Sequence, residues 1–280
     1  MSIGIGVLCC TQPNPPNLAP DAMVMISDTM GSTDTDSLGE LHKMLIDPEH
    51  KLFSVCAGRV EMAAELFPLV KGEIGQIAGP RSHGSIWRAL NTAVTRHRRE
   101  RFMWDVVNVK YAVFNEGQIA TTEHQRLMME WRKYDTGMQA LVGVFDDEGM
   151  ALLYFLGELS GQEGLVHLME FPGYFTVGSG SYNANGWLNY RGQTLGMSVA
   201  QSALHAYESS VMAASAPTVN TDIEVLIATA KDQFHLSGRN PSNPGCPISI
   251  SWLRSMAKRY GARRTDALGF RGQPSSPTSS

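Results

Sequence analysis

The sequence predicts an α+β protein in which two antiparallel sheets pack face to face between two layers of helices, a four-layer αββα sandwich. Three observations lead to this prediction. Short segments that are apolar or alternate between apolar and small residues recur along the chain, as is typical of strands. Two pairs of longer segments carry apolar residues at helical spacing instead. The order is therefore strands, two helices, strands, two helices and a strand, which two sheets with a helix pair outside each would satisfy.

The first third of the chain is expected to be rich in strands. Residues 2–10 and 22–28 predict two strands, because IGIGV alternates from the outset and AMVMISD is largely apolar. The proline-rich segment between them predicts a loop. Residues 43–46 and 52–57 predict a second hairpin around the turn DPEH.

The rest of the chain alternates between helical and strand-like patterns. Helices are expected at residues 61–75, 85–101, 184–191 and 198–214. Further strands are expected at residues 107–114, 139–146, 151–156, 166–171, 174–177 and 223–229.

These elements predict one main domain followed by a smaller C-terminal part. We expect residues 2–230 to form the domain and residues 231–266 to form an extension with a short helix. Residues 267–280 are expected to be disordered, because the end of the chain, GFRGQPSSPTSS, is low in complexity.

Composition excludes several classes of function. The chain has 280 residues, 43% of them hydrophobic, and a net charge of −4, so no general attraction to nucleic acid or an anionic membrane is expected. No signal peptide and no membrane-spanning helix are expected. The four cysteines lack zinc-type spacing and two are adjacent, which predicts reduced thiols and a cytoplasmic location. We expect neither a metal ion nor a cofactor.

The first predicted hairpin brings a carboxylate to the start of the chain. If its loop is centred near Pro15, residue i faces residue 30 − i, and Asp28 lies opposite Ser2. A serine hydroxyl needs a base, and an α-amino group, with a pKa of about 7.7–8.0, suits that task at neutral pH. If Met1 is removed, Ser2 carries both groups. The alternative is that Ser2 and Asp28 are an ordinary second residue and an ordinary strand-end acid.

Five segments, in the same order, resemble segments of proteasome β-subunits. SIGIGV resembles the mature start of those subunits, and VMISDTMGS resembles their second strand and substrate loop. HKMLID resembles their lysine-bearing third strand, and FSVCAG the strand that ends at the oxyanion glycine. FTVGSGS resembles the Gly-Ser-Gly-Ser that opens the later helix pair. Together they cover roughly residues 2–229.

The resemblance implies the fold of the N-terminal nucleophile (Ntn) hydrolases. Among its branches, the bacterial ancestral-β-subunit-like (Anbu-type) group is the most similar, because SAPTVNTDIEVL and a C-terminal extension fit that group. The implied activity is hydrolysis of peptide or amide bonds through an acyl-enzyme. The implied partners are further copies of the chain, in a ring or ring-like homo-oligomer, and peptide or unfolded-protein substrates. An unfolding ATPase partner is not identified by the sequence.

The resemblance also implies roles for single residues. Ser2 becomes the nucleophile and general base, Asp28 and Lys43 its electrostatic supports, Gly58 the oxyanion donor, and Ser179 a group that orients the amine. Gly31 and Ser32 would line the substrate strand. Gly31, Leu41, Cys56 and Val60 would shape a small to medium apolar pocket for the residue before the cleaved bond.

The sequence departs from the family pattern at three places. The nucleophile is serine, which lacks the β-methyl group that restricts a threonine rotamer. The family's acid after the last long helix has no counterpart, and Ser215, Thr218 or Asp222 would stand in for it. The loop at residues 11–21 is longer than the family's usual tight turn.

Several other interpretations compete with this one. The chain could be a catalytically inactive scaffold subunit of the same fold, or an amidase or acylase for small molecules. Cys10 is a competing nucleophile, although choosing it would destroy the first strand. Lys43 could be a surface lysine and Gly58 merely a strand end. The GSGS segment lacks the Lys-Ser/Thr of a phosphate-binding loop.

Overall fold

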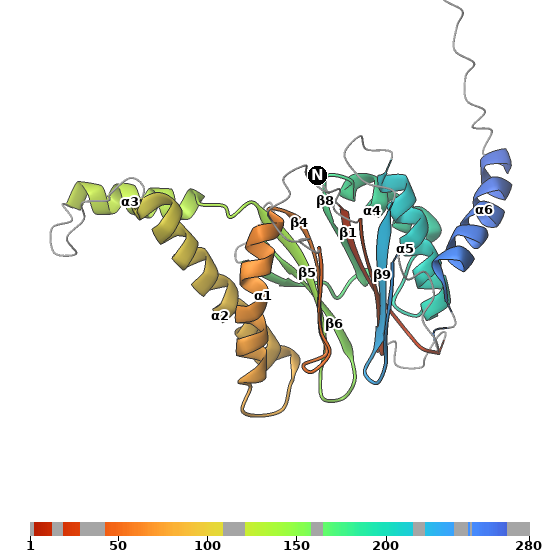
Figure 1. Ribbon diagram of the computed structural model, residues 1–280, viewed down its shortest axis with the longest axis horizontal. Helices are drawn as coiled ribbons and strands as arrows, with labels where there is room; N and C mark the ends of the chain where they lie inside the picture. The colour runs from red at the N-terminus through yellow and green to blue at the C-terminus, as the bar shows by residue number, and fades with distance from the viewer. Residues whose placement is uncertain are drawn as a thin grey trace, which may run out of the picture.

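The chain forms a four-layer αββα sandwich, as the sequence predicts. The computed structural model describes residues 3–12, 19–28, 43–108, 121–157, 165–214, 222–237, 246 and 248–267. Two five-stranded sheets lie face to face, α1 and α2 cover one outer face, and α4 and α5 cover the other (Figure 1). Within the described residues, no helix is long and apolar enough to cross a membrane.

The first sheet has the strand at the start of the chain near its middle. Its order is β10-β9-β2-β1-β8, and all neighbours are antiparallel. The strands are β1 (Ile3–Cys9), β2 (Ala22–Asp28), β8 (Tyr174–Gly178), β9 (Ile223–Thr229) and β10 (Gln233–Leu236). Since β1 pairs on both sides, its backbone is part of the core of the fold.

The second sheet is formed by the middle of the chain. Its order is β3-β4-β5-β6-β7, again with antiparallel neighbours. The strands are β3 (Met44–Asp47), β4 (Leu52–Gly58), β5 (Met138–Phe145), β6 (Ala151–Leu156) and β7 (Val166–Leu168).

Glycines in β1 allow the sheets to approach each other closely. Ile3, Ile5 and Val7 face the helix layer, where they are fully buried. A Cβ added at Gly6 would lie 2.8 Å from a methyl group of Leu153 in the opposite sheet. Both faces of β1 are therefore buried. The isoleucines and the valine of IGIGV pack on helices, and its glycines face the second sheet.

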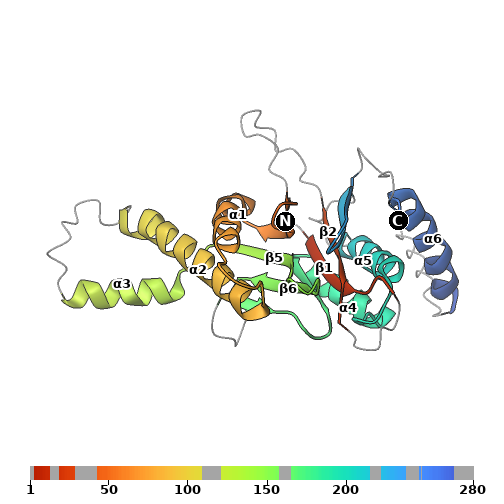
Figure 2. The ribbon, with the colours of Figure 1, turned by 90° about the horizontal axis from the view of Figure 1, so that it is seen from below.

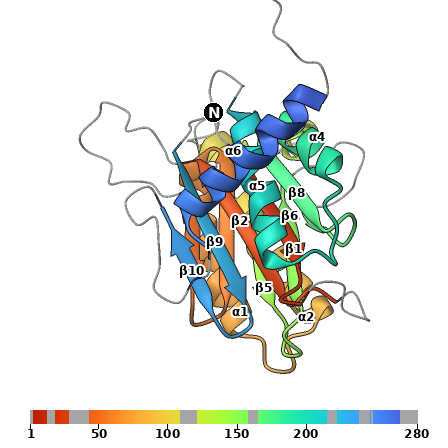
Figure 3. The same cartoon turned by 90° about the vertical axis from the view of Figure 1, so that its right-hand side faces the viewer.

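Helices form the two outer layers. They are α1 (Val60–Gly75), α2 (His83–Phe102), α4 (Ser181–Arg191), α5 (Val199–Ala213) and α6 (Ile250–Ala267). Capping boxes at Ser82 and Ser198 begin α2 and α5. The C-terminal helix α6 packs on α5 and buries Ile250 and Leu253 (Figure 3).

The expected strand at residues 107–114 was wrong over its described part. Residues up to Asn108 belong to a π-helical segment, η1 (Met103–Asn108), that continues α2, and residues 109–114 lie outside the described residues. A further helix, α3 (Thr121–Lys133), was not predicted. Both extend away from the sandwich (Figure 2). Short apolar runs do not distinguish a strand from a helix. At the end of α2, the ring of Phe102 packs edge-on against the rings of Trp131 and Tyr134.

Two further expectations about the first sheet need correction. Cys9 pairs with Ala22 and Gly4 with Ser27, so residue i faces residue 31 − i and not 30 − i. A shift of one residue changes which groups lie opposite each other, so Asp28 faces Ile3. Strand β10, which was not predicted, pairs with β9 and continues the sheet past residue 230.

Candidate functional site

A buried ion pair joins the two sheets at the edge where β1 begins. The carboxylate of Asp28, at the end of β2, accepts a hydrogen bond from the Ile3 backbone N–H (2.9 Å). The same oxygen, Oδ1, accepts a hydrogen bond from Lys43 Nζ (2.8 Å). The side chains of Asp28 and Lys43 are only 1% and 6% exposed. The structure thus brings these two candidate residues together at the backbone nitrogen of Ile3, the first residue of β1.

The Ile3 nitrogen is the atom through which β1 is joined to Ser2, which itself lies outside the described residues. Asp28 therefore binds the amide next to the candidate nucleophile as well as the candidate lysine. The Asp28 carboxylate thus holds the amino group of Lys43 beside the backbone that leads to Ser2. A lysine so deeply buried is not the solvated surface residue of the competing interpretation.

Cys56 lies against the same lysine. Its backbone N–H and its thiol both donate to the carbonyl oxygen of Lys43, at 3.0 and 3.2 Å. Burial raises the pKa of the Cys56 thiol to about 12, opposed by the Lys43 charge and reinforced by that of Asp28. A neutral, buried thiol is a small apolar surface. Val60, the first residue of α1, is also buried, so both described members of the expected apolar pocket flank the end of β4.

Gly58 ends β4 with a backbone that favours glycine. Its φ is +79°, and a Cβ at this position would overlap the carbonyl oxygen of Gly137. The next backbone N–H, that of Arg59, donates to the same Gly137 oxygen (3.0 Å). Gly58 itself is exposed. An exposed glycine with a fixed backbone at a strand end can present its N–H to a ligand.

A second link between the sheets lies at the end of β8. Gly178 pairs with Ile3 of β1, and the Gly178 N–H donates to Oε1 of Gln139 in β5 (3.1 Å). Gln139 in turn faces Ala57, next to Gly58. Ser179 follows Gly178 directly and is exposed. The role of Gln139 was not predicted from the sequence, because this residue lies far from Gly178 along the chain.

The remaining candidates are placed only in part. Asp222 is exposed and precedes Ile223, which pairs with Asp28, so Asp222 lies at the same edge of the first sheet. The other expected residues, Gly31, Ser32, Leu41, Ser215 and Thr218, lie outside the described residues.

Cys10, the competing nucleophile, lies at the opposite end of β1. Its neighbour Cys9 pairs with Ala22, at the far end of β2 from Asp28. The Cys10 thiol donates to the carbonyl oxygen of Leu195 (3.2 Å), and burial raises its pKa. Cys10 therefore has neither the ion pair nor the thiolate character that a nucleophile needs.

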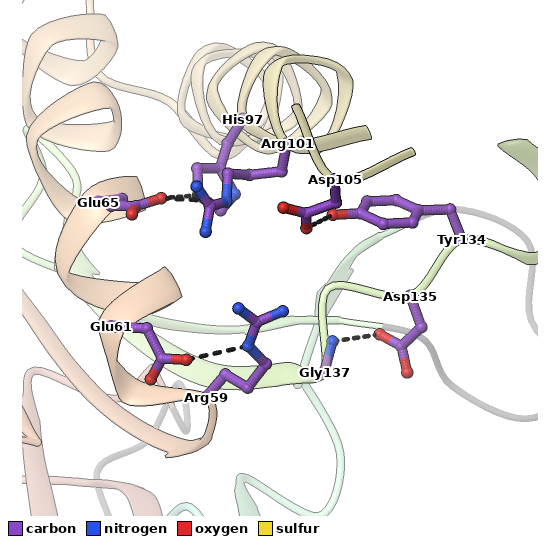
Figure 4. A network of polar contacts seen from close by, with 9 residues as sticks. All are labelled: Arg59, Glu61, Glu65, His97, Arg101, Asp105, Tyr134, Asp135 and Gly137. Carbon is purple, nitrogen blue, oxygen red and sulfur yellow. Dashed lines mark hydrogen bonds and ion pairs between the residues drawn. The ribbon is translucent and has the colours of Figure 1, made fainter. Parts of the chain in front are cut away.

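A polar network lies beyond Gly58, between α1, the end of α2 and the turn that leads into β5 (Figure 4). The sequence analysis did not predict it. It contains five contacts: Arg59 to Glu61 (2.9 Å), Tyr134 to Asp105 (2.6 Å), Gly137 to Asp135 (2.8 Å), and Glu65 to both His97 and Arg101 (3.4 Å each). Burial raises the pKa of Glu61, but the hydrogen bond from Arg59, a backbone hydrogen bond and the charges of Arg59 and Arg101 together hold that pKa below its usual value. Burial lowers the pKa of His97, against the opposing effect of Glu65.

One group of possible metal ligands occurs among the described residues, away from this edge. The group lies at the other end of β3 and consists of Asp47, the last residue of the strand, with Glu49 and His50. Asp47 already binds His50 (2.6 Å) and Lys71 (3.3 Å), and Lys71 also lies 3.7 Å from Glu49. Both carboxylates are thus already in contact with Lys71.

The two antiparallel sheets, the two helix layers and the position of β1 define a four-layer αββα fold. Anbu (ancestral β-subunit) from Yersinia bercovieri is similar over 99% of this chain and 100% of that chain, with a TM-score of 0.61 and 10% identity. The Anbu (Gly-1) mutant from Hyphomicrobium sp. strain MC1 is similar over 98% and 99%, with a TM-score of 0.60 and 11% identity. No protein-family model and no curated protein matches the sequence. The chain thus has the fold of the Anbu proteins, as the sequence resemblance implied.

Proposed function

We propose that the protein is a proteasome-like peptidase subunit that hydrolyses peptide or amide bonds through Ser2, after removal of Met1. The observation that carries the proposal is the position of Asp28. One buried carboxylate oxygen binds both the amide next to Ser2 and the ammonium group of Lys43. This arrangement would place a fixed positive charge beside a residue that supplies its own hydroxyl and, once Met1 is gone, its own amine.

The proposed reaction has two stages. The Ser2 hydroxyl attacks the substrate carbonyl while the Ser2 amine takes its proton, and the Lys43 charge stabilises the developing alkoxide. The Gly58 N–H donates to the oxyanion of the tetrahedral intermediate. The C–N bond then breaks, the leaving amine takes the proton, and an ester of Ser2 remains. Water, deprotonated by the Ser2 amine, hydrolyses this ester in the second stage.

We propose a preference for small to medium apolar residues before the cleaved bond. The apolar side chains of Cys56 and Val60, buried near the end of β4, support it, and Gly31 and Leu41 are proposed to complete the pocket. We further propose that the chain assembles as a ring or ring-like homo-oligomer in the cytoplasm and acts on peptides or unfolded proteins. A strictly monomeric mass by light scattering at micromolar concentration would contradict the assembly.

The test begins with the intact mass of the mature chain, which shows whether Met1 has been removed. Turnover of short fluorogenic amides is then measured for the wild type and for Ser2→Ala, with Ser2→Thr as the matched control. Ser2→Ala is expected to abolish turnover, and Ser2→Thr to retain it, because threonine supplies the same hydroxyl and amine. Full activity in Ser2→Ala would exclude Ser2 as the nucleophile, and a retained Met1 would favour the inactive scaffold.

A further inference from the structure

The turn before β5 controls the backbone of the candidate oxyanion residue. We propose that Asp135 is a positioning residue, which orients the Gly58 N–H through the backbone of Gly137 and Arg59. This inference rests on the proposed function and adds to it a residue that touches neither the substrate nor Ser2.

The Gly58 backbone is fixed from both sides. On one side, β4 pairs with β5, and Gly58 faces Met138. On the other side, the Arg59 N–H donates to the Gly137 carbonyl oxygen (3.0 Å). The left-handed φ of +79° at Gly58 connects these two constraints. The Gly58 N–H belongs to the peptide plane between Ala57 and Gly58, and the Gly137 oxygen holds the next plane through the Arg59 N–H. The two planes are joined by the torsions at Gly58, so a displacement of the Gly137 oxygen changes these torsions and with them the direction of the Gly58 N–H.

Asp135 holds Gly137 in place. The Gly137 N–H donates to Asp135 Oδ1 (2.8 Å), and Gly137 itself has a φ of +69°. A short side chain that accepts from the backbone two residues on stabilises a turn in this way. Figure 4 shows the Asp135 carboxylate directed at Gly137, on the strand side of the polar network. Asp135 is exposed, so its role here is to fix a backbone and not to fill the core.

The start of the turn is anchored to α2 and η1. Arg98 donates to the Tyr134 carbonyl oxygen from Nε (3.1 Å) and Nη2 (2.7 Å). Its guanidinium also lies 4.6 Å from the centre of the Trp131 ring. The Tyr134 hydroxyl donates to Asp105 (2.6 Å). With Tyr134 held by α2 and η1, the hydrogen bond from Gly137 to Asp135 determines how the rest of the turn reaches Gly58.

Loss of the Asp135 acceptor is therefore expected to affect the chemical step. An oxyanion contact is stronger in the transition state than in the ground state, so its misalignment lowers kcat more than it raises KM. We expect Asp135→Ala to lower kcat about 10-fold, less than the loss of a donor itself, with KM within about twofold. Asp135→Asn keeps an oxygen at the same place and is expected to retain wild-type kcat.

The experiment compares Asp135→Ala, Asp135→Asn and Glu148→Ala, the last a control at an exposed acid outside the site. Two quantities are measured for each: kcat and KM with a short amide, and hydrogen exchange of the peptide that contains the Arg59 amide. Faster Arg59 exchange and lower kcat in Asp135→Ala alone would support the proposal. Equal kcat in Asp135→Ala and Asp135→Asn, or unchanged Arg59 exchange, would overturn it. If the wild type hydrolyses nothing, the proposed function fails, and the exchange measurement still decides whether Asp135 holds this backbone.

Discussion

Two of the hydrogen bonds that join the sheets flank the candidate site, and they differ in kind. On one side, Lys43 and Asp28 form an ion pair that is almost fully buried. On the other side, the Gly178 N–H and the exposed Gln139 side chain form a neutral hydrogen bond. Both join the ends of strands that meet near the start of β1.

The difference in kind bears on the chemical task proposed for the charged link. A buried ion pair is costly to desolvate and is often no more stable than apolar residues of the same volume. A neutral link at the surface costs little and holds two strand ends in place. A charged pair at this position is therefore better explained by electrostatic support of Ser2 than by stability, whereas Gln139 is explained by stability alone.

The largest effect is expected for Lys43→Met. The substitution keeps most of the side chain's packing and removes the charge, so turnover should fall about 10²–10³-fold, as for other lost electrostatic supports. It also removes the lysine charge from the buried Asp28 carboxylate, which should lower the free energy of unfolding by about 3–5 kcal/mol. Amide turnover and denaturant unfolding measure the two effects. Wild-type turnover in a folded Lys43→Met protein would favour the inactive scaffold.

The double variant Asp28→Asn/Lys43→Met sharpens the comparison. The double variant has neither the lysine charge nor the buried Asp28 carboxylate. It should therefore regain most of the free energy of unfolding that Lys43→Met loses. Turnover should remain low, because the positive charge is still absent. Denaturant unfolding of the two single variants and the double variant gives the coupling energy. A stability loss in the double variant equal to the sum of the two single losses would show that the pair is not coupled.

A smaller effect is expected for Gln139→Ala. Loss of one neutral, exposed hydrogen bond should lower the free energy of unfolding by about 0.5–1 kcal/mol. Gln139→Glu keeps the acceptor for Gly178 and serves as the matched control. If Gln139→Ala reduced turnover as much as Lys43→Met does, the proposed division between a chemical and a structural link would be wrong.

The smallest effect concerns Cys56, at the charged link. With its thiol buried and its pKa raised to about 12, Cys56 should stay protonated and unlabelled by a thiol reagent from pH 6 to pH 9. Cys246, which is partly exposed, provides the internal control. Mass spectrometry of the labelled peptides distinguishes the two. Rapid labelling of Cys56 in the folded protein would show that this side of the site is open to solvent.

The order of the elements and several of their limits could be predicted from the sequence. The strands at 22–28, 151–156 and 223–229 coincide with β2, β6 and β9, because strand patterns are local and turns mark their ends. Lys43 was found through a resemblance of the segment around it. The deep burial of Lys43 beside Asp28 was not visible in the sequence, because it depends on how the two sheets pack.

What the sequence by itself determined was the alternation of strands and helices, the strand at the start of the chain and the types of residue at the site. Only the tertiary structure decided the register of β1 with β2, the helical path after Phe102, and the links made by Gln139 and Asp135. The physical reason is the range of the interactions. Side-chain periodicity acts over a few residues, whereas these contacts join segments that meet only when both sheets and their helix layers have packed.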